Sequence, residues 1–303
     1  MKREDFGPEL DRSNHWMSDE LHGVPTTCTP AEEKVKRIYC FIRDSFNCVH
    51  HDDILMNSSL KDIFDKKSGN EAEINLLLVA MLKHEKITAD PAILSTQNHG
   101  YADQSYPWLN QFNYVICVAH VGDKTIRLDA SRPYNGFDQL AGDCYNGDAR
   151  VIDKDTSYLI KLIPDSIEES KVTTVFVVND DLGFPSGNLK TTLGEVESYK
   201  MRDNIKKVSV QNYFKKLQAD YGNNIRIENP GIDSLTQPEY PVSIHYDFNL
   251  KGLVSADLVY FNPMLAGVKE NNPFKSVERY YPVEMPFRSD QNYILNMEIP
   301  KGY

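Results

Sequence analysis

The chain has 303 residues, a hydrophobic content of 41% and a formal net charge of −11, which fits a folded protein long enough for two domains. Its Lys and Arg residues are scattered among carboxylates, which argues against the clustered basic surface that a nucleic-acid partner requires. No apolar run approaches the roughly 20 residues that span a bilayer, and the charged segment Met1–Phe6 lacks an apolar signal core. We therefore expect no nucleic-acid partner and no membrane-spanning segment.

The first expected helix follows an irregular, polar lead-in over residues 1–28. Thr29 suits the N-cap, Pro30 suits the first helical position, and Glu32 completes a capping box. Apolar side chains then recur at helical spacing, at Val35, Ile38, Tyr39, Ile42 and Phe46. Residues 47–67 are expected to form a loop with a short amphipathic turn around residues 60–64.

A tight turn at Gly69-Asn70 leads directly into a second helix. This helix has no polar face over Leu76–Leu82, so it should be buried on most sides. Three strands are expected after it, at residues 92–95, 114–118 and 125–129, and Gly122-Asp123 forms the turn between the last two. Two helices followed by antiparallel strands predict an α+β fold.

The second half has a different pattern of predicted elements, being rich in strands, and we expect a domain boundary between residues 150 and 151. Strands are predicted at residues 172–178, 193–199, 225–227, 242–248 and 258–261, with one amphipathic helix over residues 204–221. The prediction is a domain over residues 29–150, in which a buried helix packs on an antiparallel sheet. A β-rich, sandwich-like domain with one inserted helix follows over residues 151–303. This second domain could be truncated, because Ile299–Tyr303 resembles the end of a strand.

The chain resembles the transglutaminase-like superfamily of papain-like cysteine enzymes. It is most similar to a branch of large bacterial proteins, mainly from Bacteroidetes, in which a transglutaminase-like core precedes a β-rich domain of unknown function. The matching segments of the core are Glu33–Tyr39, Gly69–Leu78, Leu94–Thr96, Phe112–Ile116 and Leu128–Ser131. Those of the second domain are Phe261–Pro263, Asn272–Lys275, Glu278–Val283 and Ile299–Tyr303.

The resemblance implies a catalytic triad in which a Cys attacks a carbonyl, a His moves its proton and an Asp orients the His. Residue by residue, the Cys position holds Glu71, the His position holds Asn113 and the Asp position holds Asp129. Glu71 cannot form a thioester, and Asn113 cannot carry a proton near neutral pH. We therefore predict no transglutaminase or cysteine-protease activity, and no cofactor.

Three readings of the chain stay open. The favoured one is a non-catalytic module with a binding or architectural role in an envelope-associated bacterial protein. The second is a divergent hydrolase or acyl-transfer enzyme that acts on peptides or glycans with Glu71 or Glu73 as its acid or base. In the third, purely structural reading, Glu71 satisfies N–H groups at the helix start and Asp129 bonds to Asn113.

The candidates for binding a peptide, protein or glycan are Glu73, His99, Tyr106 and Trp108. Tyr106 and Trp108, with Tyr101, form an aromatic cluster just before Asn113, where they could stack on a ligand or anchor the loop in the core.

Other reactive side chains have simpler explanations. Ser68, His99 and His120 are expected to be a turn serine and surface histidines, and His50–Asp53 a solvated loop rather than a metal site. The five cysteines show no CxxC or zinc spacing, so we expect buried or free thiols, with Cys117 in the sheet.

Overall fold

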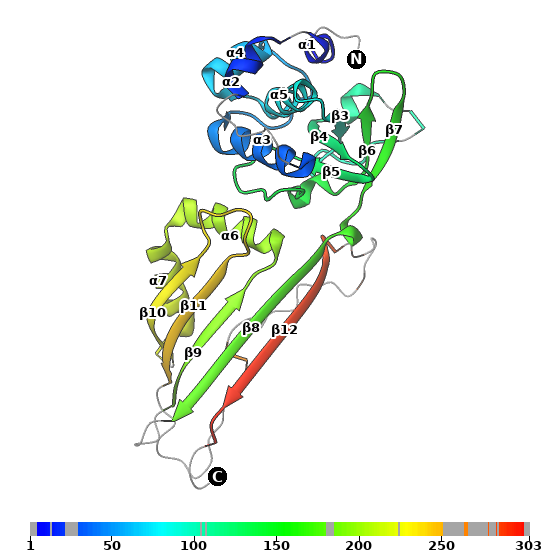
Figure 1. Cartoon of the computed structure of the whole chain (residues 1–303). Helices are drawn as coiled ribbons and strands as arrows, with labels where there is room; N and C mark the ends of the chain where they lie inside the picture. The colour runs from blue at the N-terminus through cyan, green and yellow to red at the C-terminus, as the bar shows by residue number, and fades with distance from the viewer. Residues whose placement is uncertain are drawn as a thin grey trace. The chain divides into compact units, whose positions relative to one another are not determined.

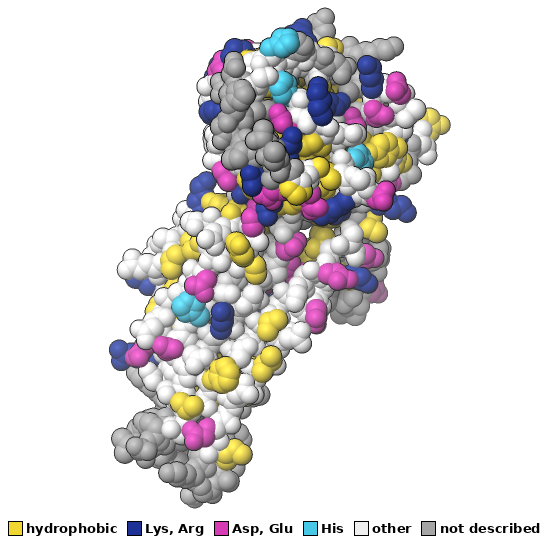
Figure 2. All heavy atoms as spheres, in the orientation of Figure 1, with side chains coloured by type: hydrophobic (Ala, Val, Ile, Leu, Met, Phe, Trp, Pro, Cys, Tyr) yellow, Lys and Arg dark blue, Asp and Glu magenta, His cyan; other side chains and the backbone are white. Residues whose placement is uncertain are grey.

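The structure is a computed structural model of the chain. It describes residues 5–12, 14–21, 30–103, 105–106, 108–179, 185–223, 225–250, 264–265, 278, 283 and 285–299. The chain divides into two compact units, Met1–Ile167 and Glu168–Tyr303 (Figure 1). Charged side chains of both signs are interspersed on the face shown in Figure 2. Within the described residues, no helix has the length and apolar character needed to cross a membrane.

The first unit is built on a five-stranded antiparallel sheet with strand order β5-β4-β3-β6-β7. Its strands are β3 (Thr88–Leu94), β4 (Tyr114–Val121), β5 (Lys124–Leu128), β6 (Gly147–Ile152) and β7 (Ser157–Leu162). The predicted boundary at 150/151 is wrong, because β6 pairs with β3 through Ala92 and Val151. The hairpin of β6 and β7 therefore belongs to the first unit, which extends to Ile167.

Helix α5 (Glu71–His84) is the centre of the first unit, and every residue from Glu71 to Leu82 is buried. It packs against β3 and β4, and against α3 (Ala31–Ser45) and α4 (Leu60–Lys66). Each of its fully buried Leu and Ile side chains contributes about 1.5–3 kcal/mol of apolar burial. The predicted buried helix is confirmed in position and in character.

The turn before α5 is a short parallel bridge between β1 (Asn47–Cys48) and β2 (Ser68–Gly69). Gly69 leaves room there for the Glu73 side chain, because an added Cβ would lie 2.8 Å from Glu73 Oε2 and displace it. The bridge places the loop after Cys48 beside the first turn of α5.

Two expectations about the N-terminal part are corrected. The lead-in is not wholly irregular, since it contains α1 (Pro8–Asp11) and α2 (Trp16–Leu21). Helix α3 begins at Ala31, and Pro30 is its N-cap rather than its first helical residue, without a side-chain cap. Thr29 lies outside the described residues.

The second unit has a five-stranded sheet with strand order β10-β11-β9-β8-β12. Its strands are β8 (Glu168–Asn179), β9 (Pro185–Thr192), β10 (Ile225–Asp233), β11 (Ser243–Leu250) and β12 (Arg288–Met297), and β12 runs parallel to β8. Helices α6 (Glu195–Val208) and α7 (Val210–Tyr221) contribute to an apolar core with inward-facing strand residues such as Val175 and Phe248. The α+β class is confirmed.

Two predictions about this unit are wrong. Residues 193–199 do not form a strand, because α6 begins at Glu195. The single helix predicted over residues 204–221 is two helices, separated at Ser209, whose φ of +68° interrupts the helical backbone. The strand predicted at 258–261 lies outside the described residues. Since the described residues form a single sheet in this unit, the sandwich-like arrangement stays a prediction.

Candidate functional site

Glu71 begins α5 and has no exposed surface. The Asp53 N–H donates to its Oε2 at 3.2 Å, and its Oε1 is buried without a hydrogen-bond partner. Burial raises the pKa of Glu71 to about 9; Asp129 adds to this rise, and the Asp53 N–H opposes it. The helix dipole favours the carboxylate by only about 0.3–1 kcal/mol, which is too little to reverse the effect of burial. The carboxyl group is therefore protonated and neutral at pH 7.

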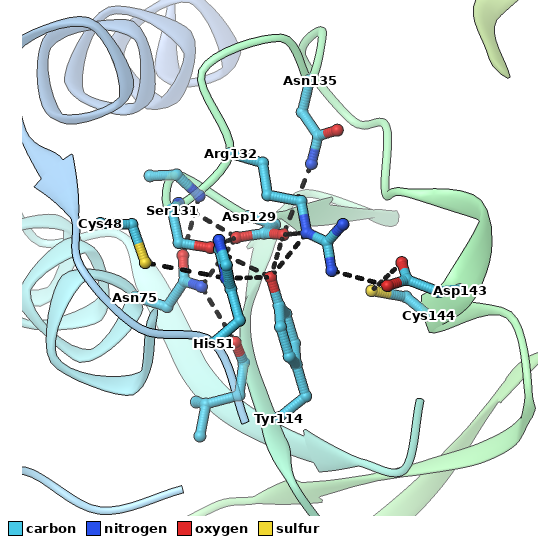
Figure 3. Close-up of polar contacts among 12 residues, drawn as sticks. Cys48, His51, Asn75, Tyr114, Asp129, Ser131, Arg132, Asn135, Asp143 and Cys144 are labelled. Atoms are coloured by element: carbon cyan, nitrogen blue, oxygen red, sulfur yellow. Dashed lines mark hydrogen bonds and ion pairs between the residues drawn. The ribbon is translucent and has the colours of Figure 1, made fainter. Parts of the chain in front are cut away.

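Asp129, directly after β5, is also fully buried, but both of its oxygens are engaged. Oδ1 accepts hydrogen bonds from Asn75 Nδ2 at 2.9 Å, from the Ser131 N–H at 3.0 Å and from Ser131 Oγ at 2.6 Å. Oδ2 accepts one from the Tyr114 hydroxyl at 3.0 Å. Figure 3 shows these donors around the carboxylate. Asp129 is held on several sides by the fold itself.

The Tyr114 hydroxyl links this carboxylate to Arg132, whose side chain is 15% exposed. Arg132 Nε donates to the hydroxyl at 2.8 Å, and Arg132 Nη2 donates to Asp143 Oδ2 at 2.8 Å. Burial and the charge of Asp129 raise the pKa of Tyr114 well above its usual value. The hydroxyl therefore stays protonated and acts as a hydrogen-bond relay between the two charged groups.

Asn113 does not bond to Asp129, so that part of the structural reading is wrong. Its Nδ2 donates to Asp52 Oδ1 and to Thr96 Oγ1, each at 2.8 Å, and its Oδ1 accepts from the Thr96 N–H at 2.9 Å. Side chains alternate across a strand, so Asn113 and its neighbour Tyr114 face opposite ways. Asn113 joins the loop after β1 to the loop after β3, and Tyr114 supplies the contact to Asp129.

Cys48 and His51 belong to this cluster, although sequence reasoning did not place them there. Cys48 Sγ lies 3.7 Å from His51 Nδ1, and the His51 ring stacks on Tyr114. Burial raises the pKa of the Cys48 thiol to about 12, and burial with the charge of Arg132 lowers the pKa of His51. The pair is therefore a neutral thiol and a neutral imidazole. The only local signal in the sequence that could have paired them is their separation of three residues.

Glu73 is not available to a ligand, which corrects its selection as a binding candidate. Its Oε1 accepts from the N–H groups of Asn57 at 2.8 Å and Ser58 at 3.0 Å, and its Oε2 accepts from the Asn70 N–H at 2.8 Å. The Asn70 side chain in turn caps the Glu73 N–H, which completes a capping box. Glu73 therefore fixes the start of α5.

The aromatic loop is exposed as a group. Tyr101, Tyr106 and Trp108 have exposed fractions of 69%, 70% and 66%, so Trp108 does not anchor the loop in the core. The base of the loop is fixed instead by Asn146, whose Nδ2 donates to backbone carbonyls, including that of Gly100 at 2.8 Å. His99 lies within this loop, with Nε2 3.0 Å from the Asn110 carbonyl. The loop therefore presents aromatic faces from a fixed base.

The remaining reactive side chains are accounted for by local contacts. His120 Nε2 lies 2.9 Å from the Tyr158 hydroxyl, and Ser68 belongs to β2. Cys117 is completely buried in β4, and its burial raises the thiol pKa. His50 Nδ1 pairs with Asp53 Oδ2 at 3.2 Å. In the described part of the chain, no three His, Cys, Asp or Glu side chains are arranged to hold a metal ion.

Comparison with known proteins gives a partial family match and two structural likenesses. Residues 257–303 match the family described as "Domain of Unknown Function with solved-structure structure (DUF3858)". No curated protein matches the chain. A "putative protease" of Parabacteroides distasonis is 15% identical, with a TM-score of 0.40, over 80% of this chain and 50% of that one. A "putative cysteine protease" of Cytophaga hutchinsonii is 15% identical, with a TM-score of 0.30, over 52% of this chain and 55% of that one.

The chain thus spans about half the length of the two solved proteins it matches. Both are described as proteases, but likenesses at these TM-scores carry no argument about the activity of this chain.

Proposed function

We propose that the first unit is a non-catalytic transglutaminase-like module, which binds a peptide, protein or glycan as part of an envelope-associated bacterial protein. The observation that carries this proposal is the state of Glu71. The position that resembles the family's nucleophile holds a carboxyl group that is fully buried and has a pKa of about 9. A neutral, desolvated carboxylic acid is a poor nucleophile and a poor base at pH 7.

The surrounding groups support the same conclusion. Acyl transfer needs a nucleophile, a base that takes its proton and a group that orients the base. Asp129 is engaged by Asn75, Ser131 and Tyr114, and a tyrosine hydroxyl held protonated by burial cannot take a proton. The nearby Cys48 thiol has a pKa of about 12, so its thiolate is scarce at neutral pH.

Binding is assigned to the exposed aromatic loop, with Tyr106 and Trp108 as the main contacts and His99 at its base. Aromatic rings on a fixed support provide flat apolar faces at a low cost in conformational entropy, which suits stacking on a sugar ring or on peptide side chains. Most exposed loops offer polar side chains instead, so an exposed Trp beside two exposed Tyr residues favours a binding role.

The proposal is tested by two measurements on purified protein. The first is a thiol-dependent transamidation and peptidase assay, in which we expect no turnover. Turnover in the wild-type protein that is lost in Asp129→Ala would contradict the proposal that the module is non-catalytic. The second is binding to arrays of peptides and glycans, in which we expect Trp108→Ala to weaken binding about tenfold. Tyr240→Ala is the matched control, because Tyr240 is an exposed aromatic residue in the second unit.

One observation favours a second candidate, a divergent hydrolase with Glu71 as its general acid. A carboxyl group that stays protonated at pH 7, with one buried oxygen lacking a partner, is the form that such an acid requires. Against this, Glu71 has no exposed surface through which a substrate could reach it. The decisive variant is Glu71→Gln, assayed on a panel of peptides and glycans. This candidate fails if there is no activity, or if an activity is unchanged in the variant.

A further inference from the structure

The aromatic loop, residues 97–111 between β3 and β4, carries apolar surface that the fold leaves in contact with water. Tyr106, Trp108 and Leu109 are all exposed. Within the described part of the chain, neither Tyr106 nor Trp108 contacts another aromatic ring. The faces of both rings are therefore open, and a ligand that stacks on them removes apolar surface from water.

Hydrogen bonds hold the two arms of this loop together. His99 Nε2 lies 3.0 Å from the Asn110 carbonyl, and the Asp103 N–H donates to Gln111 Oε1 at 3.1 Å. Because a carbonyl oxygen only accepts, Nε2 of His99 carries the proton of its bond. The Ser105 N–H donates to Asp103 Oδ1 at 2.7 Å. A loop that is ordered before binding loses less conformational entropy when a ligand arrives.

The aromatic loop is nearly free of charged side chains. Asp, Glu, Lys and Arg make up 25% of the chain, but residues 97–111 include only one of them, Asp103. Its carboxylate already accepts the Ser105 N–H. A phosphorylated, sulfated or uronic acid ligand would be bound through Lys and Arg side chains, which this segment lacks. The loop therefore suits an uncharged ligand.

Amide side chains are frequent where charged ones are missing. The Asn and Gln residues of the loop are Gln97, Asn98, Gln104, Asn110 and Gln111. Asn98 and Asn110 are exposed, and among the described residues neither side chain has a hydrogen-bond partner. Each of these two amides offers two N–H donors and an acceptor oxygen to a ligand.

A sugar ring is complementary to both kinds of group. Its C–H bonds form an apolar face that stacks on an aromatic ring, and its hydroxyls, which both donate and accept, surround that face. A proline-rich peptide also docks on aromatic surfaces. Its prolines have no N–H, however, so the amide oxygens of the loop would find no donor on it. Open rings together with unpaired amides therefore favour a sugar over such a peptide.

We infer that the aromatic loop binds a neutral oligosaccharide, with sugar rings stacked on Tyr106 and Trp108 and hydroxyls bonded to Asn98 and Asn110. Since the two aromatic rings are separate stacking faces, the ligand has more than one sugar unit. This inference rests on the proposed function, because it names the class of ligand that the same loop takes.

The test is isothermal titration calorimetry of the full chain with neutral tetrasaccharides, namely cellotetraose, xylotetraose, maltotetraose and chitotetraose. Tetragalacturonate serves as the acidic counterpart, and decaproline serves as the peptide. We expect at least one neutral tetrasaccharide to bind, and to bind more tightly than either tetragalacturonate or decaproline.

Substitutions then locate the bound sugar. Trp108→Ala should weaken its binding about tenfold, and Asn110→Ala about threefold to tenfold. Asn110→Ala keeps the backbone carbonyl that His99 contacts, so it tests the amide rather than the support of the loop. Tyr240→Ala and Asn212→Ala are the matched controls, because both residues are exposed and lie in the second unit. The controls should bind like the wild type, and equal melting temperatures show that every variant is folded.

Each contrary outcome has a distinct meaning. Binding of decaproline alone, lost in Trp108→Ala, would overturn the neutral sugar as ligand and leave the proposed function standing. Tetragalacturonate that binds as tightly as the neutral sugars would also overturn it. Sugar binding that either Trp108→Ala or Asn110→Ala leaves unchanged would overturn the site. If none of these ligands binds, the inference fails, and the peptide and glycan arrays decide separately whether the loop binds at all.

Discussion

Replacing Glu71 by Gln should stabilise the first unit at neutral pH, because the wild-type side chain must be protonated in order to be buried. The pKa of Glu71 rises from its ordinary value of 4.5 to about 9 in the fold. Gln has nearly the same shape, and its carbonyl can accept the same hydrogen bond from the Asp53 N–H. The substitution therefore removes the titration and leaves the packing in place.

The sign and size of the effect follow from linkage between protonation and folding. Below pH 4.5 the carboxyl group is protonated in both states, so wild type and variant should be equally stable. Above pH 4.5 the unfolded state loses its proton first, and the stability of the wild type falls until pH reaches the folded pKa of about 9. The slope is about 1.4 kcal/mol per pH unit, which gives the variant an advantage of about 3 kcal/mol at pH 7.

Urea unfolding followed by tryptophan fluorescence measures this difference. The two tryptophans of the chain, Trp16 and Trp108, both lie in the first unit. Trp16 packs against Phe64 with ring centroids 5.1 Å apart, so its emission reports the loss of this core. Unfolding curves for both proteins at pH 4, 5.5, 7 and 8 give the pH profile.

Glu73→Gln is the matched control, two residues further along the same helix. The Glu73 carboxylate accepts three backbone N–H groups, from Asn57, Ser58 and Asn70, and a Gln side chain offers only one acceptor oxygen. This variant should lose about 1–3 kcal/mol at pH 7. Parallel pH profiles for wild type and Glu71→Gln would refute the reasoning, because they would mean that Glu71 is ionised in the fold.

Three further substitutions test other parts of the structure. Asn113→Ala removes the bonds to Asp52 and Thr96, so urea unfolding should show a loss of about 1–3 kcal/mol and proteolysis should cut the loop after β3 sooner. Asp129→Asn removes one of the two carboxylates beside Arg132, which keeps its pair with Asp143, and replaces one of the two acceptor oxygens of a buried hydrogen-bond cluster, so it should cost about 1–3 kcal/mol by the same assay. Ser209→Gly relieves a φ of +68° at the expense of a weak cap and should raise the melting temperature of the second unit, equivalent to about 1 kcal/mol.

The core of the first unit could be predicted because its signals are local. The apolar run Leu76–Leu82 specifies a buried helix whatever surrounds it. The start of α6 could not be predicted in this way. Its first N–H groups, at Val196 and Glu197, donate to Glu169 at 3.0 and 2.8 Å. This cap is supplied by β8, which is distant in the sequence. The alternating pattern of residues 193–199 predicted a strand, and the local sequence held no sign of the contact that favours a helix instead.

In the site, the sequence predicted the positions of the residues along the chain but not the directions of their side chains. The sequence located β4 correctly, but it assigned the contact with Asp129 to Asn113 instead of to Tyr114. A shift of one residue on a strand moves a side chain to the other face of the sheet. Which face points at the carboxylate depends on the pairing of β4 with β5, where Cys117 lies opposite Leu128, and this register is a property of the folded sheet.

Asp129 matches the catalytic pattern of the family that the chain resembles, yet its contacts give it a different use. An aspartate that orients a base needs one hydrogen bond to that base. Here Asn75 donates from α5 to Asp129, and also to the Val115 carbonyl of β4, while its own Oδ1 accepts from the Ala130 N–H. The carboxylate therefore closes a buried junction between the central helix and two strands. These contacts account for Asp129 whether or not a reaction occurs, so its presence is not evidence for catalysis.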